Sequence, residues 1–140
     1  MPADAAQHPL QSDQIDRLVA VFYARLRQDP QLGPVFAAAI GPDAACWRRH
    51  EAWIAGFWRK ATGLDRSAYE GNPQQVHSAN PDIAPGHFDI WLSHFRAAAE
   101  EVLAPEQAAA IHAMATRIGR GMRIGVQAAR QPQGAPPVLS

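Results

Sequence analysis

The chain has 140 residues, 47% of them hydrophobic, which suits one compact domain with a core of its own. Acidic and basic residues number 13 each, so no strong field draws the protein toward nucleic acid or an anionic membrane. The one cysteine, Cys46, excludes an internal disulfide and favours a reducing compartment.

We expect neither a membrane-spanning segment nor a secretory signal in the sequence. No stretch approaches the roughly 18 apolar residues of a membrane-spanning helix. The N-terminus "MPADAAQHPL" lacks the basic start and the apolar run of a secretory signal, so we expect a cytoplasmic protein. Residues 1–11 and the proline-rich residues 129–140 are expected to be disordered, which leaves residues 12–128 as the folded domain.

The first half of the chain predicts two long helices with a short helical turn between them. Ser12 and Asp13 are suited to cap the first helix, and Asp29-Pro30 ends it, because the residue before a proline resists the α region. The segment "LGPVFAAAIGP" predicts a single short turn between two Gly-Pro breaks. Asp43 then caps a helix that runs to about Gly63, a residue suited to a left-handed C-terminal cap.

The second half begins with an irregular segment, residues 64–84, which has little periodicity and two prolines. Compact domains rarely hold such a long loop unless it serves a function or is disordered. Pro85 is expected to open the next helix, and Pro105 the last one, which extends to about Val126. The chain is therefore predicted to be all-α, with four main helices and one long irregular segment.

Three side chains with polar tips lie on or beside the apolar faces of these helices. Tyr23 lies at the edge of one face, His50 shares a face with Trp47, and Trp91 lies in the middle of another. Buried polar tips need hydrogen-bond partners, and several that converge on an apolar space indicate a binding pocket. Each residue alone is more often plain core, and a loop histidine such as His77 is more often solvated.

The remaining polar candidates have ordinary interpretations. Cys46 is expected to be a small buried hydrophobic side chain, and Arg48 and Arg49 to form a solvated helix face. No role at the site is expected for the other histidines, which are His8, His87, His94 and His112.

Motifs for most metal and nucleotide sites are absent from the sequence. There is no cysteine pair, no HExxH, no glycine-rich phosphate loop after a strand and no Gly-x-Ser-x-Gly elbow. A single histidine is too few for a bare metal ion, but it is enough for haem, in which the porphyrin supplies four nitrogens. Because Cys-x-x-Cys-His is also absent, any haem is held non-covalently.

Four segments carry a family resemblance: "VFYARLRQDPQLGPVFAAAIG", "CWRRHEAWIAGFW", "YEGNPQQVH" and "HFDIWLSHF". In order and spacing they resemble the truncated haemoglobins, specifically their third group, over about residues 12 to 125. The absence of Gly-Gly pairs also fits this group. The resemblance implies an all-α, shortened globin fold, a two-over-two helical sandwich with an irregular proximal segment, around one haem b.

The resemblance also implies roles for individual residues. His77 matches the proximal histidine that binds the iron. Tyr23 and Trp91 match the distal residues that contact the bound gas, and His50 matches the distal gate. The further haem contacts that it implies are Phe36, Ile54, Phe57, Trp58, Tyr69 and Phe88, with Trp91 serving both roles.

One position departs from the family pattern. Trp53 stands where relatives often carry a basic residue that reaches a haem propionate. The candidates left for that contact are Arg49, Arg66 and Tyr69.

The function implied by the resemblance is the binding of O2, nitric oxide, carbon monoxide or peroxide at a histidine-ligated iron. Two distal donors predict tight O2 binding with slow release, which argues against a simple carrier. Redox chemistry such as nitric oxide or peroxide detoxification is expected, with an unidentified reductase as partner. The alternatives are a peroxidase-like or electron-transfer haem protein, or a cofactor-free helical interaction domain on the same scaffold.

Overall fold

The computed structural model describes residues 10–65 and 83–129, and within these ranges the regular structure is entirely helical. The five helices are α2 (Ser12–Gln28), α3 (Leu32–Ile40), α4 (Ala44–Ala61), α6 (His87–Val102) and α7 (Pro105–Ala129). The predicted all-α class is therefore confirmed. None of the helices in these ranges is long and apolar enough to cross a membrane.

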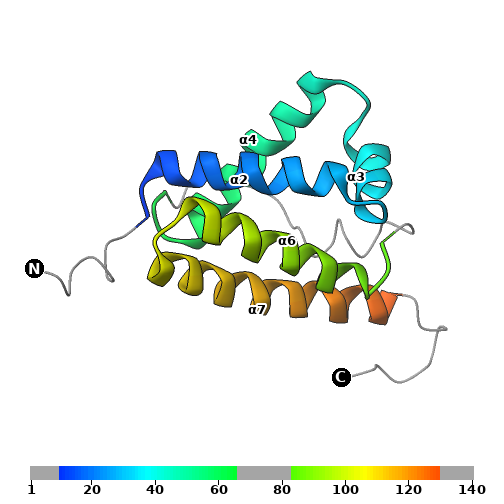
Figure 1. The fold of residues 1–140 in the computed structure, drawn as a ribbon. Coiled ribbons are helices and arrows are strands. Elements are labelled where there is room, and N and C mark those ends of the chain that lie inside the picture. Colours follow the sequence, from blue (N-terminus) through cyan, green and yellow to red (C-terminus); the bar gives the residue numbers. More distant parts are fainter. Residues whose placement is uncertain (1–9, 66–82, 130–140) are drawn as a thin grey trace, which may run out of the picture.

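The helices form two layers. Figure 1 shows α6 and α7 running antiparallel side by side, with α2 lying over α6 and α4 crossing behind α2. The most extensive helix contacts are between α6 and α7, α2 and α6, and α2 and α4. The short α3 packs mainly on the end of α2. This arrangement leaves one face of α2 and one of α6 turned toward each other.

The core at this contact is aromatic. The Phe22 ring lies edge-on to the rings of Trp91 and Phe95, with centroid distances of 5.6 and 5.2 Å. The indole of Trp58, only 1% exposed, stacks on Phe95 at 4.9 Å. Edge-to-face and offset-stacked rings add about 0.5–1.5 kcal/mol per pair to the burial of their surface. The four rings join α2, α4 and α6.

The helix ends agree in part with the sequence predictions. Gly63 has the predicted left-handed conformation, with φ of +81°. The first helix, by contrast, is capped by Gln11 and not by Ser12 or Asp13: the Gln14 side-chain oxygen accepts the Gln11 N–H at 2.8 Å. The helix predicted to open at Pro85 begins two residues later, at His87.

Two terminal predictions meet the described residues only at their edges. Leu10, inside the segment expected to be disordered, packs against the core. The last helix ends at Ala129, one residue beyond the predicted domain boundary. Residues 1–9 and 130–140, which make up the rest of the two expected disordered ends, lie outside the described residues.

Asp43 stands at the N-cap of α4 as predicted, but its carboxylate has a different partner. It accepts a hydrogen bond from the Cys46 thiol at 2.9 Å, which is the leading cause of a lowered Asp43 pKa. Arg49 donates to the same sulfur at 3.3 Å. The expectation that Cys46 is a buried hydrophobic side chain is therefore wrong, because polar neighbours hold it at a partly exposed position.

The predicted short turn is a full nine-residue helix, α3. Asp29 begins it as well as ending α2: its Oδ1 accepts the N–H groups of Gln31 and Leu32, each at 2.8 Å. Pro30 follows Asp29 in the turn that precedes the N-cap residue Gln31, outside the helix, so its missing N–H removes no helical hydrogen bond. The Asp29-Pro30 step, predicted only to end α2, thus also begins the turn that leads into α3.

Gly33 lets α3 approach the end of α2 closely. A Cβ at this position would lie 2.9 Å from the Arg27 backbone oxygen, which a rigid helix end cannot yield easily. We expect Gly33→Ala to lower the free energy of unfolding by about 1–2 kcal/mol, because overpacking outweighs the gain in helix propensity. Urea unfolding at constant m-value measures it.

The matched control for this prediction is Gly121→Ala in α7. A Cβ at Gly121 meets nothing within 4 Å, so the same substitution should stabilise the protein by up to about 1 kcal/mol. Equal effects at both positions would show that contact with α2 does not select glycine at Gly33.

A polar pair joins the start of α3 to α6. The Asp29 Oδ2 lies 2.8 Å from His94 Nε2, and the two side chains are only 13% and 21% exposed. The hydrogen bond from His94 is the largest of several causes that hold the Asp29 pKa below its ordinary value, followed by the bond from the Leu32 N–H. His94, for which no role at the site is expected from the sequence, thus has a specific partner on another helix.

This lowered pKa predicts a pH dependence of stability. The Asp29 carboxylate stabilises the fold when charged, so its contribution is fully present above the unfolded carboxyl pKa of about 3.9. It is lost as pH falls through the lower, folded value. We expect the difference in unfolding free energy between the wild type and Asp29→Ser to shrink steadily below about pH 4. A constant difference down to the acid limit would contradict a charged Asp29.

Candidate functional site

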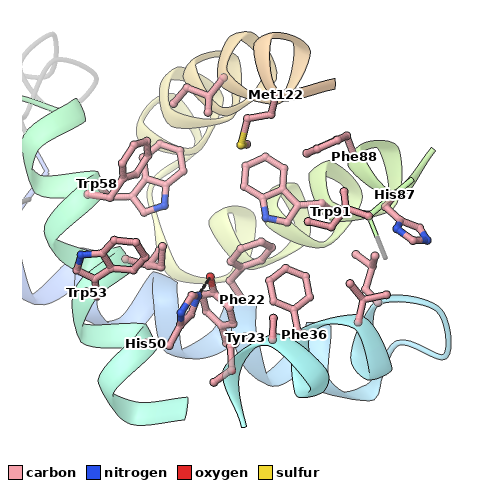
Figure 2. A pocket seen from close by; sticks show the side chains of 18 residues that line it. Phe22, Tyr23, Phe36, His50, Trp53, Trp58, His87, Phe88, Trp91 and Met122 are labelled. Carbon is pink, nitrogen blue, oxygen red and sulfur yellow. Dashed lines mark hydrogen bonds between the residues drawn. The ribbon is translucent and has the colours of Figure 1, made fainter. Parts of the chain in front are cut away.

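A pocket of about 1120 Å³, part of it open to solvent, lies between the two helix layers. Figure 2 shows its walls, which are almost entirely aromatic and aliphatic side chains. Eight of the residues predicted for the site line it together: Tyr23, Phe36, His50, Ile54, Phe57, Trp58, Phe88 and Trp91. The other two, Tyr69 and His77, lie outside the described residues.

The principal polar contact in the pocket joins α2 to α4. The Tyr23 hydroxyl lies 3.0 Å from His50 Nε2 (Figure 2). The Tyr23 side chain is buried, and this burial, with a smaller contribution from the charge of Glu51, raises its pKa far above the ordinary value. The hydroxyl therefore keeps its hydrogen throughout the physiological range and remains able to donate it.

Aromatic neighbours fix the orientation of the Tyr23 ring. Its centroid lies 5.9 Å from that of Phe36 and 6.3 Å from that of Trp47, both in edge-to-face geometry. The Arg27 guanidinium in turn covers the Trp47 ring at 4.6 Å from its centroid. A ring held on several sides keeps its hydroxyl at one place in the pocket.

Trp91 is held as firmly on the α6 side. Its ring stacks on Phe95 with a centroid distance of 5.7 Å and an interplanar angle of 20°. On its far side α7 approaches closely at Gly119, where a Cβ would lie 3.6 Å from the Trp91 ring. Figure 2 shows the indole between Phe22 and Met122, with its edge toward the pocket.

The predicted departure, Trp53, lies at the rim of the pocket. It lines the pocket and yet is 41% exposed, and its ring lies 6.0 Å from that of His50. An aromatic side chain thus covers the edge at which, by the resemblance, relatives often carry a basic one. Of the alternative propionate partners, Arg49 is exposed and bonded to Cys46, while Arg66 and Tyr69 lie outside the described residues.

Sequence reasoning missed several residues of the pocket wall. They are Phe22, Leu32, Val35, Ala39, Ile40, Ile83, His87, Ile118 and Met122. His87, for which no role at the site was expected, has its Nδ1 accepting the Ala84 N–H at 3.1 Å. Its position four residues before Trp91 on the same helix was a usable signal. For Ile118 and Met122 the apolar pattern of α7 could not tell a pocket wall from ordinary core.

The chemistry of this lining fits a large, flat and mostly apolar group. Such ligands bind where apolar walls surround a few placed polar atoms, as Tyr23 and His50 are placed here. Within residues 10–65 and 83–129, no three His, Cys, Asp or Glu side chains gather in a way that could hold a metal ion.

Comparison with known proteins agrees with the fold and the pocket. No protein-family model matches the chain. The group 3 truncated hemoglobin ctb of Campylobacter jejuni is 35% identical over 86 residues, which make up 61% of this chain and 67% of that protein. The crystal structure of a group III truncated hemoglobin from Campylobacter jejuni superposes with a TM-score of 0.78 at 29% identity, covering 83% of this chain and 91% of that one.

The helical arrangement is thus that of a truncated haemoglobin. With the extent of the sequence match, the chain belongs to the group 3 truncated haemoglobins. Membership of this family implies a haem cofactor and diatomic gas ligands.

Proposed function

We propose that this protein binds haem b in the pocket, with His77 as the iron ligand, and holds O2 or a related ligand beside Tyr23, His50 and Trp91. The observation that carries the proposal is the Tyr23–His50 hydrogen bond at 3.0 Å inside a pocket with mostly apolar walls. A buried polar pair of this kind is costly unless it serves a polar partner or a specific structure.

When bound, haem supplies an iron centre that takes up diatomic ligands and exchanges electrons with them. The apolar side chains do the rest of the binding. Phe36, Ile54, Phe57, Trp58 and Phe88 offer the apolar contact surface and exclude water. Because the cofactor binds only the native state, it also stabilises the fold, and the apoprotein should unfold more easily.

The Tyr23–His50 hydrogen bond contains one hydrogen, which the Tyr23 hydroxyl or the His50 Nε2 donates according to the His50 tautomer. If Tyr23 donates to a ligand, His50 can keep the bond only by donating from its own Nε2. Ligand binding then selects one tautomer or charge state of His50. The pair is thereby suited to carry a proton between the His50 ring and a reacting ligand.

Two donors next to a negatively polarised ligand imply tight binding and slow release. Hydrogen bonds to a charge-bearing acceptor are worth about 1.5–3 kcal/mol, against about 1.4 kcal/mol for a tenfold change in affinity. This retention suits a protein that reacts with its ligand, by oxidising nitric oxide to nitrate or by cleaving peroxide, and suits a carrier poorly. Repeated turnover of either kind would need a source of electrons, for which we propose a reductase partner.

An optical spectrum of the purified protein, supplied with haem, tests the proposal. We expect a strong Soret band that shifts after dithionite and again after carbon monoxide. A protein without a Soret band in excess haem would overturn the proposal. A haem spectrum that carbon monoxide leaves unchanged would contradict the open distal site.

A further inference from the structure

The Asp29 carboxylate makes two kinds of contact at once. Oδ1 accepts the N–H groups of Gln31, the N-cap residue of α3, and of Leu32, its first residue, at 2.8 Å each. Oδ2 pairs with His94 Nε2 on α6, also at 2.8 Å. One side chain therefore holds the beginning of α3 to the middle of α6, across 65 residues of sequence.

The two helices joined in this way carry facing walls of the pocket. Phe36 lies one turn after Leu32 on α3, and its ring meets the edge of Tyr23 at 5.9 Å. His94 lies three residues after Trp91 on α6, one turn along the helix. Figure 2 shows Phe36 and Trp91 facing the same space from these two helices. Direct contact between α3 and α6 is otherwise small.

We propose that Asp29 and His94 are positioning residues of this site: their pair fixes α3 against α6, and so sets how firmly Tyr23 and Trp91 retain a ligand. The inference rests on the proposed function. Neither residue touches the pocket, and both act through the helices that they join.

The setting of the pair separates it from an ordinary surface ion pair. Exposed pairs contribute little, because water and salt screen them. Asp29 and His94 are 13% and 21% exposed, whereas Arg96 and Glu100, which pair with each other on α6, are 65% and 59% exposed. The second pair is a control built into the same helix.

The test uses the haem-loaded protein and four variants. Asp29→Ser keeps an oxygen for the α3 N–H groups but is too short to reach His94. His94→Leu removes the other partner, and His94→Gln restores a donor at similar reach. Arg96→Ala is the control. The measurements are the O2 dissociation rate and the rate of haem transfer to an excess of a haem-scavenging apoprotein.

We expect Asp29→Ser and His94→Leu each to raise both rates about tenfold, the change for one lost charge-assisted hydrogen bond. The double variant should exceed neither single one, because both remove the same contact. His94→Gln should return toward wild type, which a merely space-filling role for His94 would not produce. Arg96→Ala should match wild type.

Several results would overturn the inference. They are single variants no different from Arg96→Ala, rates that multiply in the double variant, or a His94→Gln protein no better than His94→Leu. In each case wild type still binds haem and carbon monoxide, so the proposed function stands. A wild type that binds no haem overturns the proposed function, and this inference falls with it.

Discussion

Replacing His77 with glycine is expected to have the largest effect of any single change, loss of most of the bound haem and of the ferrous spectrum. In the proposed function the porphyrin supplies four nitrogens and His77 supplies the imidazole ligand, so glycine removes the one coordinate bond between the chain and the iron. Added imidazole should enter the space and restore the spectrum toward that of wild type. Absorbance titration with haem, with and without imidazole, measures both effects.

The structure supplies the control that this experiment needs. Among the described residues, two other histidines, His50 and His87, line the pocket. If His77 is the iron ligand, His87→Ala should keep the wild-type haem spectrum. The reverse result, a His87→Ala protein without haem and a His77→Gly protein with it, would assign the iron to the start of α6.

Tyr23→Phe is expected to raise the O2 dissociation rate by about 10- to 150-fold. The change removes the hydroxyl hydrogen and keeps the ring, so the contacts with Phe36 and Trp47 persist. The loss of one hydrogen bond to a charge-bearing acceptor, about 1.5–3 kcal/mol, gives this range. Stopped-flow displacement of O2 by carbon monoxide measures the rate.

Two further variants apportion the effect. Trp91→Phe removes the indole N–H and keeps an aromatic ring, so a comparable increase would mean that both donors retain O2. His50→Leu removes the Tyr23 partner and should change ligand entry and peroxide reactivity more than O2 release. Unchanged O2 release in Tyr23→Phe would mean that the hydroxyl stays with His50 while the ligand is bound.

Much of the fold could be predicted because apolar spacing is a local property of the chain. The long helices α2, α4, α6 and α7 all follow from it. For α3 only a short helical turn was predicted, because its start depends on a carboxylate, Asp29, whose second partner is His94, 65 residues away. The burial predicted for Cys46 was wrong because Asp43 and Arg49 make polar contacts with its thiol, and composition does not reveal such contacts.

Site residues could be predicted where a sequence pattern identifies them. They could not where only tertiary packing brings a residue to the pocket. Tyr23, His50 and Trp91 were chosen as polar tips on apolar faces, and the structure places all three at one pocket. No role at the site was predicted for His87, because a single histidine at the start of a helix is more often a structural or solvated residue than a ligand. Ile83 and Met122 enter the wall only through tertiary packing of α6 and α7, which no local pattern specifies.

The shared use of the aromatic residues limits how this protein can evolve. Phe22 and Trp58 line the pocket and are also 1% exposed members of the main core, stacked or edged against Phe95. A larger protein can alter its binding site and leave its core alone, but here the same rings belong to both. Substitutions that change ligand preference are therefore tolerated best at exposed residues on the rim of the pocket, such as Ala39 and Trp53, because a new side chain there leaves the core intact.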